Sequence, residues 1–176
     1  MLIFFLIVTQ SYSDNYKHNC VVPDILIETV KMTENETLYP FFIRTNDSKS
    51  IENFYSIAKK YNYKKTDDIM LIDCMNQATC ISIAKELVNS NITNLDLGLY
   101  QVNYDSYPNG VKTFFDEIPA YKNACSAVID KIKIHKKWSW EVLAAYHSAS
   151  PKKNKIYKDK LIANYIKLTQ RKRESL

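Results

Sequence analysis

The stretch "DLGLYQVNY", residues 96–104, contains one of only two glycines in a chain of 176 residues. Glycine adopts backbone dihedral angles that other residues avoid, and it lets the backbone approach another group closely because it has no Cβ. A chain that uses glycine so rarely places it where one of these properties is needed. We therefore predict at Gly98 either an unusual dihedral angle or a close approach to a ligand, with Leu99, Tyr100 and Gln101 forming one wall of a cleft.

The remaining sequence predicts a mostly helical domain of the α+β class. Hydrophobic residues make up 46% of the chain, which is enough for one sizeable core. Pro23 stands at the first position of a predicted helix, where its missing N–H costs nothing. One short strand is predicted over residues 66–76. Apolar spacing predicts helices over residues 23–34, 50–61, 77–90, 111–118, 120–137, 139–149 and 151–176.

The N-terminus carries an apolar run, residues 2–8, followed by Ser11 and Ser13. This order is typical of an export signal with a small-residue cleavage site. We predict a signal peptide over residues 1–13 and one domain over residues 14–176. A buried first strand is the alternative. Neither interpretation gives an integral membrane span, because the run is too short.

The four cysteines show no metal-ligand spacing and form an even set. Oxidised pairs in an extracytoplasmic compartment explain such a set best, and reduced core cysteines are the alternative. Cys74 and Cys80 enclose a short loop and are candidates for a local bridge. That pairing leaves Cys20 with Cys125.

The formal charge is +5, with 24 Lys and Arg against 19 Asp and Glu. Much of the excess lies in the tail, residues 151–176, where apolar residues recur at helical spacing. We expect the basic residues to form the outer face of a docked helix. We expect no nucleic-acid partner, because no nucleic-acid-binding motif accompanies the charge.

Glu34 continues the apolar face of the first predicted helix. On a helical wheel of 3.6 residues per turn, Leu26, Ile27 and Val30 fall within about 80° of it. A carboxylate on a core-facing stripe loses hydration, and at a helix C-terminus it meets the negative end of the dipole. Both effects favour the protonated form, which a general acid needs. The alternative is a helix that ends earlier, with Glu34 in water.

Three stretches now stand in a fixed order: "VPDILIETVKMTEN" at 22–35, "DLGLYQVN" at 96–103 and "VLAAYHSAS" at 142–150. Together they resemble the lytic transglycosylases of the lysozyme-like superfamily. They are most similar to the small exported members that accompany type IV secretion and conjugation systems. The resemblance covers most of residues 20–150 and implies a lysozyme-like fold.

Carried over residue by residue, the resemblance implies that Glu34 is the catalytic acid and base. It also implies that Tyr146 hydrogen-bonds this glutamate. Several positions depart from the family pattern: Asn35 replaces Ser, Tyr100 replaces Met, and His147 replaces Asn. The substrate-binding residues implied by the motifs are Asn35, Gly98, Leu99, Tyr100, Gln101, Tyr146 and His147.

The distance from Glu34 to Asp96 is longer than in the family. We expect the extra residues, 45–92, to form an inserted lobe containing the predicted strand and the Cys74/Cys80 loop. For Asp96 we expect a role in bracing the turn before Gly98. Asp96 and Asp105 are nevertheless the candidates for a second carboxylate, as in a hydrolytic lysozyme.

The activity implied by the resemblance is cleavage of the β-1,4 bond between N-acetylmuramic acid and N-acetylglucosamine, with a 1,6-anhydro product. It implies no cofactor and no metal. It places a monomer in the periplasm or cell envelope, acting on peptidoglycan strands beside a secretion or conjugation apparatus. A lysozyme-type hydrolase and an inactive wall-binding scaffold are the alternatives.

Overall fold

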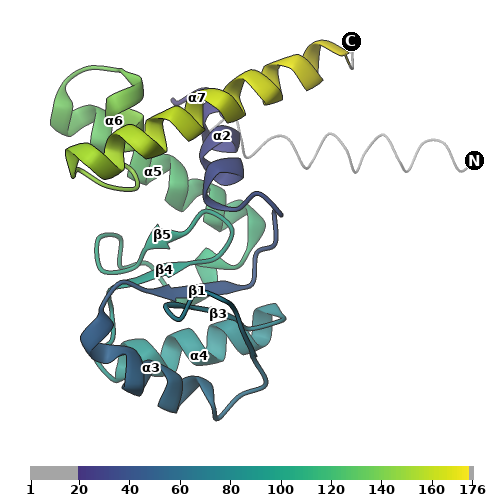
Figure 1. Cartoon of the computed structure of the whole chain (residues 1–176), viewed down its shortest axis with the longest axis vertical. Coiled ribbons are helices and arrows are strands. Elements are labelled where there is room, and N and C mark those ends of the chain that lie inside the picture. Colours follow the sequence, from purple (N-terminus) through teal and green to yellow (C-terminus); the bar gives the residue numbers. More distant parts are fainter. Residues whose placement is uncertain (1–19, 175–176) are drawn as a thin grey trace, which may run out of the picture. The chain divides into compact units, whose positions relative to one another are not determined.

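A computed structural model describes residues 20–174 of the chain (Figure 1). These residues form two compact units, one of residues 20–29 with 128–174 and one of residues 30–127. Helices α2 (Asp24–Glu34) and α5 (Glu117–His135) each run from one unit into the other. The predicted α+β class with mainly helical content is confirmed. The predicted signal peptide, residues 1–13, lies outside the described residues.

The unit of residues 30–127 is built around a five-stranded antiparallel sheet. Its strands are β1 (Phe42–Thr45), β2 (Lys64–Lys65), β3 (Leu71–Asp73), β4 (Leu95–Leu97) and β5 (Val102–Asn103), in the order β2-β3-β1-β4-β5. Alternate residues point to opposite faces of a strand. One face is buried and carries Ile43, Ile72, Leu95 and Leu97.

Helices cover the buried face of this sheet. Helix α3 (Ile51–Ala58) follows the short helix η2 (Ser48–Ser50) and lies beside α4 (Gln77–Asn89), which packs on β1 (Figure 1). The side chain of Asn76 caps α4 by accepting a hydrogen bond from Thr79 N at 2.9 Å. The unit also contains η3 (Val111–Phe114).

The predicted inserted lobe is not a separate body. Residues 45–92 lie in the same compact unit as the strands that flank them. Strand β3 comes from this segment and pairs with β1, in the register Ile43 to Ile72. The reason is physical: strands of two to four residues cannot stand alone, so the segment completes the sheet instead of forming its own.

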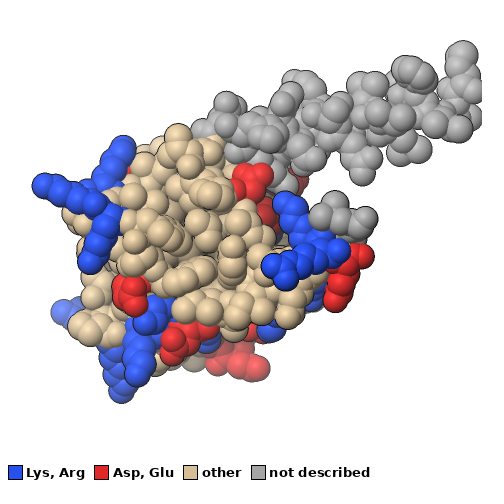
Figure 2. Space-filling model, turned by 90° about the horizontal axis from the view of Figure 1, so that it is seen from above, with Lys and Arg blue, Asp and Glu red and all other residues tan. Residues whose placement is uncertain are grey.

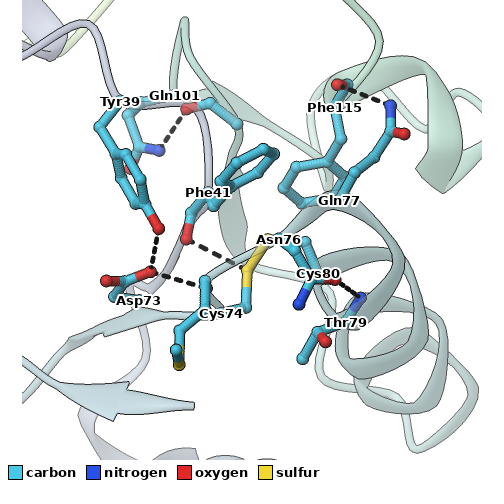
Figure 3. Close-up of a disulfide and its surroundings, with 12 residues drawn as sticks. Tyr39, Phe41, Asp73, Cys74, Asn76, Gln77, Thr79, Cys80, Gln101 and Phe115 are labelled. Carbon is cyan, nitrogen blue, oxygen red and sulfur yellow. Dashed lines mark hydrogen bonds between the residues drawn. A yellow bond between two sulfur atoms is a disulfide. The ribbon is translucent and has the colours of Figure 1, made fainter. Parts of the chain in front are cut away.

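All four cysteines are oxidised, as predicted. Cys74 and Cys80 form the predicted local bridge, which joins the end of β3 to the first turn of α4 with a Cα–Cα distance of 5.1 Å (Figure 3). Cys20 and Cys125 are also disulfide-bonded.

The unit of residues 20–29 and 128–174 is wholly helical. Helix α6 (Trp140–Ala144) packs against α7 (Pro151–Glu174), and Leu143 and Leu161 are buried there. Ser139 caps α6 by accepting a hydrogen bond from Val142 N at 3.2 Å. The helix is shorter than the predicted 139–149. No helix among residues 20–174 has the length and apolar character to cross a membrane.

Candidate functional site

The polar face of the sheet centres on Asp96 in β4. Pairing of β4 with β1 sets Arg44 opposite Asp96, and pairing with β5 sets Asn103 opposite it on the other side. Asn103 Nδ2 donates to Asp96 Oδ1 at 2.9 Å, and the side chain of Asn46 also hydrogen-bonds the carboxylate. Arg44 Nη1 bonds Asp68 Oδ2 at 2.7 Å. Asp96 is therefore held between amide donors beside a guanidinium.

Asp96 interacts with the predicted catalytic residue. Burial raises the pKa of Asp96 above its ordinary value, and the negative charge of Glu34 raises it further. The hydrogen bonds from Asn46 and Asn103 and the charge of Arg44 oppose this rise. Asp96 lies in β4, and its hydrogen bond from Asn103 of β5 joins the two sides of the turn that contains Gly98.

Glu34 is the last residue of α2, as predicted, and its side chain is half-buried. Directly after it, Asn35 is 6% exposed. Asn35 Oδ1 accepts hydrogen bonds from Thr37 Oγ1 at 2.8 Å and from Tyr39 N at 3.3 Å, and its Nδ2 donates to Tyr39 O. Both ends of the amide hold the loop together. The expectation that Asn35 contacts substrate is therefore corrected: this side chain shapes the loop that follows Glu34.

Tyr39 fastens the same loop to the sheet (Figure 3). Its hydroxyl donates to Asp73 Oδ1 at 2.8 Å, and this oxygen also accepts from Met75 N at 2.7 Å. Burial and the Asp73 carboxylate raise the pKa of Tyr39 to about 12. The loop after Glu34 is thus tied to the segment that carries Cys74. Sequence analysis missed this contact, because it joins residues far apart in the chain.

The glycine motif forms the turn between β4 and β5. Gly98 has a φ of 70°, and a Cβ placed there would lie 2.0 Å from the Phe114 carbonyl oxygen. The predicted dihedral is confirmed, but the close approach is to the protein backbone and not to a ligand. Gln101 has a φ of 46°, and its Nε2 donates to Gly98 O at 2.6 Å. The amide of Gln101 therefore stabilises the turn.

Tyr100 does not form the wall of a cleft. Its side chain is 2% exposed and packs edge-on against Tyr121, with ring centroids 6.4 Å apart. The expectation that it binds sugar is corrected: alternation through the turn directs Tyr100 into the core. Leu99 is half-buried and lines a cavity of about 330 Å³. Phe41, Phe115 and Gln77 also line this cavity and are seen in Figure 3.

Tyr146 and His147 lie in the other unit, just after α6. Tyr146 is half-buried. His147 is exposed and stacks face to face on Tyr157, with ring centroids 4.7 Å apart and planes 9° apart. Of the predicted site residues, Glu34, Asn35 and residues 98–101 therefore share one compact unit, and Tyr146 and His147 share the second.

Comparisons of the chain with protein-family models, with curated proteins and with solved structures give no match.

Proposed function

We propose that the chain cleaves the glycan strands of peptidoglycan, with Glu34 as the catalytic acid. The observation that carries this proposal is that Glu34 and the part-buried carboxylate of Asp96 lie in one compact unit, where the negative charge of Glu34 helps to raise the pKa of Asp96. Glycosidic bonds are cleaved by such carboxylates, one of which gives a proton to the leaving oxygen. The substrate follows from the three sequence stretches that resemble lytic transglycosylases.

In the transglycosylase reaction, Glu34 gives its proton to the oxygen between N-acetylmuramic acid and N-acetylglucosamine, and the bond from this oxygen to C1 breaks. The C6 hydroxyl oxygen of the muramic acid then bonds to C1, and its proton passes to the Glu34 carboxylate. No water is consumed, because the nucleophile belongs to the substrate. The carboxyl group of Asp96 lies in the same unit and is the candidate to stabilise the positive charge that develops at C1.

A lysozyme-type hydrolase is the second candidate, and the position of Asp96 favours it. In that reaction the same proton leaves Glu34, but a water molecule supplies the oxygen that finally bonds to C1, with Asp96 as the second carboxylate. The two reactions leave different ends on the glycan. A hydrolase releases a reducing muramic acid, and a transglycosylase releases the 1,6-anhydro form.

The deciding experiment is mass spectrometry of muropeptides after digestion of purified peptidoglycan by the protein and by Glu34→Gln. We expect anhydro products from the parent and a rate lower by about 10²–10⁴ in the variant. Glu52→Gln is the matched control, since Glu52 is an exposed carboxylate of the same unit to which neither reaction gives a role. Reducing ends alone would establish the hydrolase. Equal rates for the parent and Glu34→Gln would remove Glu34 as the acid.

The setting of this activity is also a proposal. Four oxidised cysteines suit a compartment outside the cytoplasm. Together with the resemblance, they support an exported monomer that opens the wall for a secretion or conjugation apparatus. Tyr146 belongs to the proposal through the third of the resembling stretches, residues 142–150. Tyr146→Phe tests its contribution by removing the hydroxyl and keeping the ring, and we expect the cleavage rate to fall.

A further inference from the structure

The helical unit carries the positive charge of the protein. Residues 128–174 contain 13 Lys and Arg against 4 Asp and Glu, whereas residues 30–127 contain 10 against 12. In the space-filling view, the middle of one face is uncharged, and Lys and Arg side chains lie at its margins together with Asp and Glu side chains (Figure 2).

An apolar groove of about 490 Å³ lies within the same unit. Leu26 of α2 and Ile129 and Ile132 of α5 line it, together with Val21 and Trp138. Val21 is 85% exposed and Trp138 46% exposed. Two large apolar side chains of this surface therefore meet water. We call the surface that these residues line the apolar groove.

Lysines accompany the apolar groove. Lys133 lines it, and Lys136 and Lys137 come directly before the lining residue Trp138 in the chain; all three are exposed. Lys133 Nζ lies 4.0 Å from Asp130 Oδ1. One carboxylate offsets one of the three lysine charges, so most of the local positive charge stays uncompensated. A tryptophan ring beside ammonium groups at an apolar surface is the chemistry of the membrane interface, where the ring sits at the headgroup level and lysines meet anionic headgroups.

We propose that the apolar groove and its lysines bind the surface of a bilayer that contains anionic lipids. Charge complementarity selects this partner, since each lysine near such a surface strengthens binding about fivefold. A soluble polyanion would engage the lysines and leave Val21 and Trp138 in water.

The test is co-sedimentation of the full chain with vesicles of phosphatidylcholine alone or with phosphatidylglycerol. Tryptophan emission is recorded in parallel, because burial of Trp138 in lipid shifts it to the blue. We expect binding to the anionic vesicles to weaken at least about tenfold in Val21→Ser/Trp138→Ser. We expect a similar loss in Lys133→Glu/Lys136→Glu/Lys137→Glu, which leaves the apolar side chains in place.

The matched control is Lys64→Glu/Lys65→Glu/Ile69→Ser, which changes two exposed lysines and an isoleucine that is 66% exposed in the other unit. It should bind vesicles as the parent does. Any one of three results would overturn the proposal. The first is that both groove variants bind anionic vesicles as the parent does, and the second is that the parent binds neutral and anionic vesicles equally. The third is that the parent binds a DNA duplex as tightly as anionic vesicles, without dependence on Trp138.

Cleavage of a soluble peptidoglycan fragment separates this inference from the proposed function. The groove variants should cut it at the parent's rate, because none of their changes lies in the unit that carries Glu34 and Asp96. A protein that binds anionic vesicles through the groove but cuts no glycan would refute only the proposed function.

Discussion

Asn103 lies directly opposite Asp96 across the β4–β5 pair and donates a hydrogen bond to its carboxylate at 2.9 Å. The same Nδ2 atom donates to Asn94 Oδ1, also at 2.9 Å. Both hydrogens of the amide are therefore used, and the backbone of Ser106 donates to its oxygen at 3.0 Å. These bonds hold the side chain of Asn103 in place without a ligand, as a preorganised site requires.

Asp96→Asn should make the protein more stable at neutral pH. Burial raises the pKa of Asp96, so the folded protein holds this proton more tightly than the unfolded chain does. Protonation of Asp96 stabilises the folded protein fully at pH values below 3.8, the ordinary pKa of the side chain. This stabilisation is lost as the pH rises through the pKa that Asp96 has in the folded protein. At pH 7 the parent is therefore destabilised by a part-buried negative charge that the variant lacks.

We expect Asp96→Asn to raise the free energy of unfolding at pH 7 by on the order of 1 kcal/mol, and the gain to shrink towards pH 3. Urea unfolding at several pH values measures both. Asp105→Asn, on an exposed side chain that accepts from Thr93 Oγ1 at 2.9 Å, is the control and should show no such trend. A less stable Asp96→Asn at pH 7 would contradict the prediction.

Tyr39 should titrate later than an ordinary tyrosine. Its pKa is raised to about 12 by burial and by Asp73, so the stabilisation from the neutral ring is present below pH 10 and lost as the pH rises through 12. The pKa of Tyr55 and of Tyr61 is raised as well, so ultraviolet absorbance should record a late transition whose amplitude falls in Tyr39→Phe. In Asp73→Asn the part that belongs to Tyr39 should move towards the ordinary value of 10.0. An unchanged late amplitude in Tyr39→Phe would assign the transition to other residues.

The two glycines should respond differently to the same change. At Gly98, alanine meets both a φ of 70° and the Phe114 carbonyl oxygen at 2.0 Å. The dihedral alone costs roughly 1–2 kcal/mol, and the clash adds to it. At Gly110 the nearest atom, Thr113 Cγ2, is 4.0 Å away. Thermal unfolding should show a large loss for Gly98→Ala and almost none for Gly110→Ala, and similar losses in both would refute this account.

The bridge between Cys74 and Cys80 should contribute to stability even though its loop is short. The sequence separation is 6 residues, and closing a loop of this size in the unfolded chain corresponds to about 2 kcal/mol. We expect Cys74→Ala/Cys80→Ala to lower the free energy of unfolding by this amount, measured by urea denaturation. An unchanged midpoint would mean that the capped end of α4 holds this corner without the bridge.

The helices could be predicted from the sequence because their signals are local. Apolar spacing and Pro23 predicted α2 with its end at Glu34, and Ser139 predicted the start of α6. Most of the sheet could not be predicted, because its strands have two to four residues and depend on distant partners. Strand β1 has four residues and carries no alternating pattern long enough to detect.

The same long-range pairing explains which site residues were misjudged. The burial of Asp96 depends on β1, whose residue Arg44 is far from it in the chain. The burial of Tyr100 depends on Tyr121 in another element. Asn35 looked like a substituted catalytic neighbour, and only the path of the loop shows that its amide is used within the protein.

The pairing of β1 with β4 also sets an order of folding. These strands can meet only when the chain between them, residues 46–94, has closed into a loop, and that loop holds α3, β3 and α4. Closing a long flexible loop costs conformational entropy, and prior folding of its contents reduces that cost. Strand β4 therefore joins β1 late. The carboxylate of Asp96 reaches its place between Arg44 and Asn103 in one of the last steps, so partly folded chains lack the assembled polar face.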